Sequence, residues 1–322
     1  MTILSLSAQR KNANIAPLLT RSAVLTRSRP LLRHCAAALA LGLVSAGTAA
    51  ETITVSAAAS LGDAFKAIAR EYEAQHPEDN VLLNVGGSGT LLQQIRQGAP
   101  VDVFASADEA TMDKADEAGL IAPDSRHIFA RNTLVLIQPA NAHDRLNSLE
   151  ALTADGVRRI AMGNPDSVPA GRYTRRALEA AGVWEALQPR MILTQNVRQA
   201  LDYVARGEVG AGFVYGSDVA RRLDPMLPNP TLPGSPVAGS TLRDATRPDT
   251  TPQSDAVTVA FTVPLDTPVN YPIALVGEAD SKPAASRFLD LVLSPTGQSL
   301  LMHYGFEGAA TRPDDIKGSH AP

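Results

Sequence analysis

The sequence predicts an α/β fold, because short apolar runs typical of strands alternate with amphipathic runs typical of helices along most of the chain. Its 322 residues are enough for about two domains. In addition, several strand-like runs end in small residues and a hydroxyl immediately before a helix-like run. Such junctions lie at the edge of an α/β sheet where ligands bind.

The first 50 residues have the composition of a secretory signal peptide. They contain six Lys or Arg residues and no acidic residue, and an apolar run over 35–45 is followed by small residues over 47–50. The apolar run is too short for a membrane-spanning helix. We therefore expect cleavage near Ala50 and a periplasmic mature protein.

The composition of the rest of the chain argues against several classes of function. The chain has 29 basic and 33 acidic residues, so the product without its basic leader is acidic and gives no support for nucleic-acid binding. Cys35 is the only cysteine and would leave with the signal, which excludes a disulfide and a thiolate metal site. The histidines show no metal-ligand spacing, and we expect no cofactor.

In the first half of the chain, strands lead directly into helices. The apolar stripe after Ser60 predicts a helix, and Ser60 with Asp63 resembles a capping box at its start. The last of these strands, 133–137, would lead the chain into a second domain. The predicted strands are 52–55, 81–85, 101–105 and 133–137, and the predicted helices are 60–73, 90–97 and 107–118.

The second half repeats this alternation of strands and helices. A stretch rich in Pro, Thr, Ser and Gly over 228–255 interrupts it and predicts a long surface loop. The predicted strands are 159–162, 191–193, 210–214, 256–263 and 273–276, and the predicted helices are 172–181, 196–205, 282–293 and 295–304.

Ser60 and Ser88 stand where a strand-like run meets a helix start. A helix start has free backbone N–H groups, and together with a serine hydroxyl these form a neutral cradle for an anion. Two such cradles on neighbouring strands would converge. The alternative is that each serine is an ordinary N-cap, a common role for serine at this position.

Ser88 also has an enzymatic interpretation. The segment 86–90 nearly matches the nucleophile elbow of Ser hydrolases, which has a Gly where this chain has Thr90. No downstream Asp and His stand in an evident triad arrangement. A secreted Ser hydrolase that uses Ser88 therefore remains an alternative.

Three residues of the second half are candidate donors as well. Ala170 precedes a predicted helix, Val197 follows a predicted Asn196 N-cap, and Tyr215 ends an apolar strand. Backbone N–H groups at helix starts and a phenol can each donate one hydrogen bond to an anion. The alternatives are a plain helix start, a core side chain and a rim aromatic.

Taken together, these segments resemble the periplasmic molybdate-binding proteins of ATP-driven (ABC) importers. The resemblance covers about residues 52–306. The segments that carry it are AAASL (57–61), SGTL (88–91), GAPVDVFASAD (98–108), VPAGRY (168–173), NVRQAL (196–201) and VYGSD (214–218).

The resemblance implies a type II periplasmic binding fold, in which two lobes, each with a mixed sheet flanked by helices, enclose a ligand cleft. It implies a signal peptide at 1–50, lobe 1 at 51–130, lobe 2 at 131–262 with an insertion at 228–255, and a return to lobe 1 with a polar tail at 263–322. The ligand is molybdate or tungstate, and the partner is a membrane permease. Molybdenum is held only as the bound oxyanion, by donors from the side chains and backbone of Ser60, Ser88, Ala170, Val197 and Tyr215.

The chemistry of these donors agrees with the implied ligand. All are neutral, and a fully deprotonated tetrahedral dianion offers only acceptors, whereas a protonated anion would leave its O–H unpaired. We expect a monomer that catalyses nothing. Alternatives are a binding protein for sulfate or another tetrahedral oxyanion and, against the export signal, the effector domain of a regulator.

Overall fold

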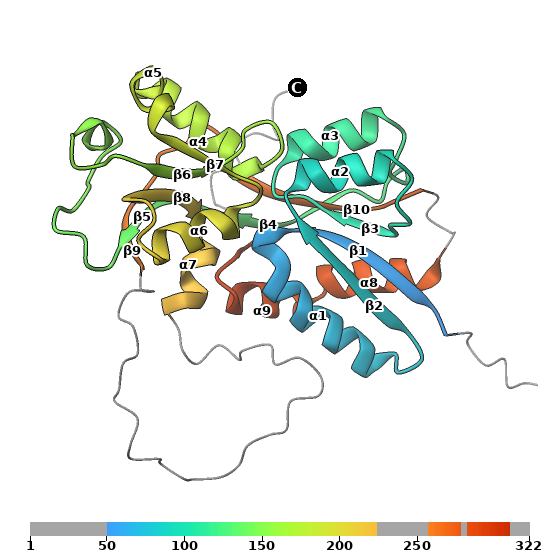
Figure 1. Ribbon diagram of the computed structural model, residues 1–322. Coiled ribbons are helices and arrows are strands. Elements are labelled where there is room, and N and C mark those ends of the chain that lie inside the picture. Colours follow the sequence, from blue (N-terminus) through green and yellow to red (C-terminus); the bar gives the residue numbers. More distant parts are fainter. Residues whose placement is uncertain (1–49, 224–256, 278–281, 310–322) are drawn as a thin grey trace, which may run out of the picture. The chain divides into compact units, whose positions relative to one another are not determined.

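The computed structural model describes residues 50–223, 257–277 and 282–309, which form two mixed sheets flanked by helices (Figure 1). The predicted two-lobe α/β architecture is confirmed. The predicted signal peptide and the 228–255 loop lie outside the described residues. Within the described part of the chain, no helix is long and apolar enough to cross a membrane.

Lobe 1 is built on a six-stranded sheet in the order β11-β4-β10-β3-β1-β2. Strand β1 pairs in parallel with β2 and β3, whereas β10 runs antiparallel to β3 and β4. Its strands are β1 (Thr52–Ala58), β2 (Asn80–Gly86), β3 (Val103–Ala105), β4 (His127–Asn132), β10 (Val269–Leu275) and β11 (Glu307–Gly308).

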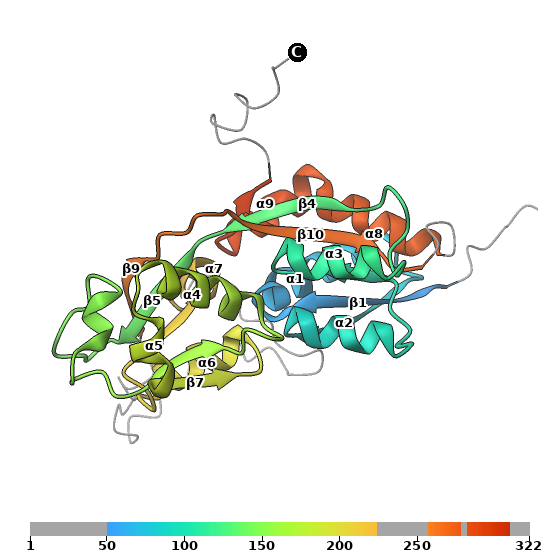
Figure 2. The same cartoon turned by 90° about the horizontal axis from the view of Figure 1, so that it is seen from above.

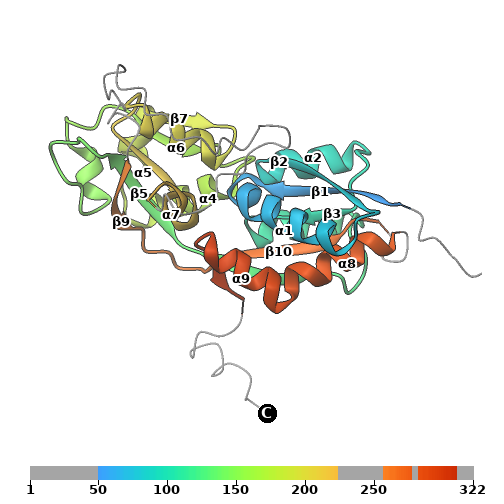
Figure 3. The same cartoon turned by 90° about the horizontal axis from the view of Figure 1, so that it is seen from below.

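Helices cover both faces of this sheet. Helices α2 and α3 lie on one face, and α1, α8 and α9 lie on the other (Figures 1 and 3). The helical segments are η1 (Ala59–Leu61), α1 (Gly62–Gln75), α2 (Ser88–Arg96), α3 (Glu109–Glu117), α8 (Pro283–Leu293) and α9 (Pro295–His303).

Lobe 2 has a five-stranded sheet in the order β7-β6-β8-β5-β9. Strand β6 is parallel to β7 and β8, and β5 is antiparallel to β8 and β9. The strands are β5 (Leu134–Pro139), β6 (Ile160–Gly163), β7 (Met191–Thr194), β8 (Ala211–Tyr215) and β9 (Val257–Thr262); the helical segments are η2 (Glu150–Thr153), α4 (Pro169–Ala180), α5 (Trp184–Leu187), η3 (Gln188–Arg190), α6 (Val197–Ala205) and α7 (Gly216–Leu223).

The chain passes from one sheet to the other twice. It leaves lobe 1 between Asn132 and Leu134 and returns between Thr262 and Val269 (Figure 2). Both crossings run next to each other at Asn132, since residues of both line one pocket. Lobe 1 therefore combines the first and the last segments of the described chain.

The structure differs from the predicted elements at several places, two of which have a local physical reason. Strand β4 was not predicted, because only two of its residues, Ile128 and Phe129, are large and apolar, although it pairs with both β10 and β11. Helix α4 begins at Pro169 rather than at Arg172. Proline suits the first turn of a helix, because its missing N–H would have had no partner there.

A buried polar cluster ties the two ends of lobe 1 together. Asp79 follows α1, and its carboxylate accepts hydrogen bonds from the Tyr72 hydroxyl at 2.7 Å, from Arg287 of α8 at 2.8 Å and from the Glu51 backbone N–H at 3.1 Å. Burial acts to raise the pKa of Asp79, but these hydrogen bonds outweigh it and hold the pKa below its ordinary value of 3.8. Asp79 also lies within 4.8 Å of possible metal-ligand atoms of His76 and Glu78.

We predict that Asp79→Asn lowers the free energy of unfolding at pH 7 by about 1–3 kcal/mol, because it removes the charge from these hydrogen bonds. The folded-state pKa is depressed, so this stabilisation is complete above the unfolded-state pKa and is lost as the pH falls through the folded-state pKa. Urea unfolding of wild type and variant should therefore differ at pH 7, and the difference should shrink as the pH falls below about 4. Glu78→Gln, an exposed neighbour, is the control and should unfold like wild type. A difference that persists unchanged at pH 3 would contradict this account.

Candidate functional site

The structure brings all five candidate residues together at one small cavity between the lobes. Ser60 and Ser88 come from lobe 1, and Ala170, Val197 and Tyr215 come from lobe 2. The cavity is buried and small, about 10 Å³, and none of the five residues is more than 3% exposed. Pockets for drug-sized ligands measure about 300–1,000 Å³, so this one excludes such ligands.

Three helices begin at this cavity. Ser88 is the first residue of α2, Ala170 is the second residue of α4, and Val197 is the first residue of α6. N–H groups in the first turn of a helix have no acceptor within the helix, and the helix dipole makes this end partly positive. The cavity therefore combines unpaired N–H donors with a favourable potential for an anion.

Neither serine is a helix cap, so that interpretation of Ser60 and Ser88 is wrong. The N-cap positions of α1 and α2 are Leu61 and Gly87, and neither helix has a side-chain cap. The hydroxyl of Ser60 instead forms a hydrogen bond with the Tyr271 hydroxyl at 3.0 Å, and that of Ser88 accepts one from the Ala107 backbone N–H at 3.1 Å. The Ser88 hydroxyl thus keeps its proton for a ligand.

The predicted Asn196 cap of α6 is confirmed. Its side-chain oxygen accepts a hydrogen bond from the Gln199 backbone N–H at 3.0 Å. Capping by Asn196 fixes the first turn of the helix. This fixed turn is the one that carries the Val197 N–H at the cavity.

Tyr215 is fully buried at the end of β8, so the alternative of a rim aromatic is wrong. Its hydroxyl donates to the Ala107 carbonyl oxygen of the opposite lobe at 3.5 Å, a long hydrogen bond. Burial above all raises the pKa of Tyr215 well above 10.0, with smaller contributions from neighbouring groups. The phenol therefore stays neutral, and its one proton can pass from this long bond to a bound anion.

The glycines beside Ser88 have a role that sequence reasoning missed. The Gly89 N–H donates to the Ser167 carbonyl oxygen of lobe 2 at 2.9 Å, and a Cβ at Gly89 would lie 2.8 Å from that oxygen. A Cβ at Gly87 would lie 2.7 Å from the Gln195 carbonyl oxygen, also in lobe 2. Glycine at both positions lets the backbones of the two lobes approach each other.

Two arginines next to the donors were also missed. Arg172, in the first turns of α4, pairs with Asp108 of lobe 1 at 2.7 Å and donates to the Thr111 hydroxyl at 2.6 Å. This ion pair is largely buried, since the Asp108 side chain is 5% exposed and that of Arg172 is 19% exposed. It links the lobes beside the cavity.

The second arginine, Arg198, directly follows Val197. It pairs with Asp63 of lobe 1 at 3.1 Å and with the buried Asp218 of lobe 2 at 2.9 Å. Burial raises the pKa of Asp218, and the charge of Arg198 opposes this shift. Both arginines are thus paired with aspartates before any anion binds, so neither offers an uncompensated positive charge to it.

The Ser hydrolase alternative finds no general base at the cavity. Among the described residues, those that line it include no histidine, no carboxylate and no lysine or arginine. Activation of a serine nucleophile requires a base within hydrogen-bond reach. The Ser88 hydroxyl instead accepts from a backbone N–H, which cannot take its proton.

Comparisons with known proteins agree with this architecture. A family model for bacterial extracellular solute-binding proteins matches residues 53–307. The molybdate-binding protein ModA of Escherichia coli K12 is 32% identical over 79% of this chain and 88% of its own length. A putative ABC transporter substrate-binding lipoprotein of Bacillus subtilis, YvgL, is 30% identical over 79% of this chain and 86% of its own.

Solved structures show the same fold. The substrate-binding domain of a putative molybdenum ABC transporter from Clostridium difficile is 29% identical with a TM-score of 0.55, and it covers 81% of this chain and 100% of its own. The periplasmic molybdate-binding protein of Azotobacter vinelandii has a TM-score of 0.63 at 23% identity over the same shares. The sulfate-binding protein SubI of Mycobacterium tuberculosis has a TM-score of 0.64 at 15% identity, over 84% of this chain and 92% of its own.

The family model spans most of the chain, and it includes every residue that lines the interlobe cavity. The chain therefore belongs to the bacterial extracellular solute-binding protein family.

Proposed function

We propose that this protein binds molybdate, and also tungstate, outside the cytoplasm and delivers it to the permease of an ABC importer. The observation that carries the proposal is the convergence of neutral donors from both lobes at one small buried cavity. The names of its relatives, several of which are molybdate-binding proteins, support the choice of anion.

The donors favour a fully deprotonated anion. Ser60, Ser88 and Tyr215 contribute hydroxyls, and Ala170 and Val197 contribute backbone N–H groups; none of these groups is charged. Molybdate and tungstate at neutral pH present four acceptor oxygens and no proton. Hydrogen phosphate would bring an O–H group that needs an acceptor, and burying it unpaired costs about 1–3 kcal/mol.

Sulfate has the same charge and shape as molybdate, so size must separate them in this proposal. Sulfate is the smaller ion, so donors spaced for molybdate would bind it less well. A sulfate-binding protein is the second candidate function, since one shares the fold. That likeness, at 15% identity, concerns the fold alone.

The remaining parts of the proposal follow from the family. Residues 1–50 act as a signal peptide that is cleaved near Ala50, and the mature protein works as a periplasmic monomer. It uses no cofactor, catalyses no reaction and binds no nucleic acid. Its partners are the oxyanion and the permease.

We predict that Ser88→Ala weakens molybdate binding by about tenfold or more. The substitution removes one hydrogen bond to a charged ligand, which contributes roughly 1.5–3 kcal/mol. Calorimetric titration of the mature protein with molybdate, tungstate and sulfate measures this loss. Ser148→Ala, in the connection after β5, is the control and should bind like wild type. Wild-type affinity in Ser88→Ala would remove Ser88 from the site, and a wild type that prefers sulfate would favour the second candidate function.

We also predict that the ion pair between Arg172 and Asp108 contributes to closure of the lobes. Arg172→Gln should weaken molybdate binding by roughly tenfold without touching the proposed donors, because the largely buried pair holds the lobes together. Small-angle scattering should show that molybdate compacts the wild type, and that the ligand-free variant is more open than the ligand-free wild type. Arg175→Gln is the control, since Arg175 pairs with Glu179 within α4. Equal affinity and equal compaction in both variants would contradict this role.

A further inference from the structure

The oxygens of both serine hydroxyls at the cavity are already engaged by a neighbouring group. Ser88 Oγ accepts from the Ala107 backbone N–H at 3.1 Å, and a backbone N–H can only donate. The Ser88 proton is therefore left for the cavity. For Ser60 the neighbour is the Tyr271 hydroxyl at 3.0 Å, and either oxygen can act as donor. The direction of this bond decides whether Ser60 offers a proton or a lone pair to an anion.

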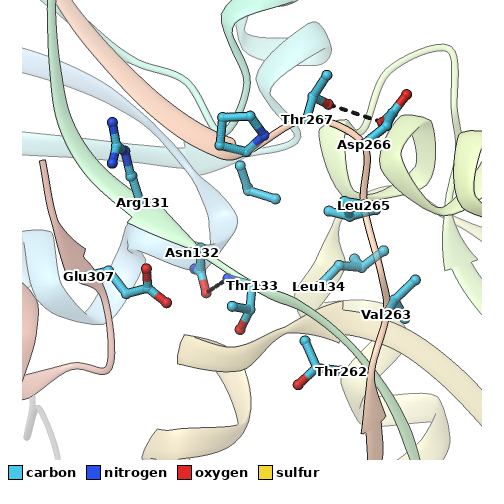
Figure 4. A pocket seen from close by; sticks show the side chains of 12 residues that line it. Arg131, Asn132, Thr133, Leu134, Thr262, Val263, Leu265, Asp266, Thr267 and Glu307 are labelled. Atoms are coloured by element: carbon cyan, nitrogen blue, oxygen red, sulfur yellow. Dashed lines mark hydrogen bonds between the residues drawn. The ribbon is translucent and has the colours of Figure 1, made fainter. Parts of the chain in front are cut away.

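The direction is set by Asn132, the last residue of β4 before the chain crosses between the lobes. Its side-chain oxygen accepts from the backbone N–H of Thr133 at 2.9 Å (Figure 4) and from that of Ser217 at 3.3 Å. Because these two groups can only donate, the amide orientation is fixed. Asn132 Nδ2 must then donate, and it faces the Ser217 hydroxyl at 2.8 Å and the Tyr271 hydroxyl at 3.3 Å.

Tyr271 thus accepts a hydrogen bond from Asn132, and its own hydroxyl proton still needs an acceptor. The side chain is fully buried, and burial above all raises its pKa well above 10.0, so the phenol keeps this proton. Within the described part of the chain, Ser60 Oγ is the acceptor available to it. Leaving a buried O–H unpaired is costly, so Tyr271 donates to Ser60.

We propose that Asn132 and Tyr271 are positioning residues that fix the single proton of Ser60 toward the bound anion. Hydrogen bonds run in one direction, from the backbone at the crossing through Asn132 and Tyr271 to Ser60. Ser88 is held in the same state by Ala107. Each serine then presents its proton to the cavity, where the O–H of a protonated anion would meet a donor rather than an acceptor. This inference rests on the proposed function and explains how the site separates molybdate from a monoprotonated anion of equal charge.

The test compares molybdate with hydrogen arsenate at pH 8, where both are tetrahedral dianions and only arsenate carries a proton. Affinities of both for the mature protein are measured by calorimetric titration. Tyr271→Phe keeps the ring, which packs edge-on against Tyr215 and Phe306. It frees the Ser60 hydroxyl to turn and accept from the arsenate O–H, so the ratio of molybdate to arsenate affinity should fall by about tenfold or more.

Two further variants control this experiment. Tyr203→Phe removes a phenol whose oxygen accepts from Gln199 on the same helix, and its affinity ratio should match wild type. Asn132→Asp still accepts from the two backbone N–H groups, but its other carboxylate oxygen accepts a hydrogen bond from Tyr271. Ser60 must then donate to Tyr271, so the direction of these hydrogen bonds is reversed. The added charge repels both dianions alike, so a lower ratio again supports the proposal.

Thermal unfolding identifies which of Tyr271→Phe and Asn132→Asp are folded. The affinity ratio of either folded variant then tests the proposal. Equal weakening of both anions, or an unchanged ratio, would show a merely structural role and overturn the proposal. A wild type that fails to bind molybdate contradicts the proposed function instead. In that case the ratio of sulfate to hydrogen phosphate affinity tests the positioning role separately.

Discussion

The interlobe cavity depends on one constraint: a buried anion there must be satisfied by neutral donors. Helices α2, α4 and α6 direct their N-terminal ends to the cavity, where N–H groups of the first turn have no partner within the helix. The nearest cations, Arg172 and Arg198, are neutralised by aspartates. Helix dipoles therefore provide the favourable potential, and no counter-ion has to be buried against the ligand.

The groups that hold the lobes together stand beside the groups that would bind the anion. Arg172 lies in the first turns of α4 beyond Ala170, and Arg198 follows Val197 in α6. Both reach aspartates of lobe 1. Any opening of the lobes would break these ion pairs and withdraw the lobe 2 donors together. Ligand affinity and the closed arrangement are thus coupled through the same two helix starts.

Local patterns in the sequence were sufficient to predict the two-lobe α/β class, most strands and helices, and the Asn196 cap. The spacing of apolar residues and the capping of a helix both depend on residues close together in the sequence. Together with the family resemblance, these patterns also selected five residues that the fold brings to one cavity. The roles of Ser60 and Ser88 as caps were wrong, because the partner of Ser60 is 211 residues away in the sequence. The interlobe ion pairs and the Asn132–Tyr271 network were missed for the same reason: no local pattern reports a contact between distant strands.

The central claim is that neutral donors bind a fully deprotonated dianion. It is tested most directly by the number of protons exchanged on binding. Calorimetric titration with molybdate at pH 7.5, in buffers of different ionisation enthalpy, measures this number. We expect none, because the buried phenols Tyr215 and Tyr271 keep their protons and the anion has none to lose. Uptake or release of close to one proton per anion would contradict the account, since a titrating group or a protonated anion would then take part in binding.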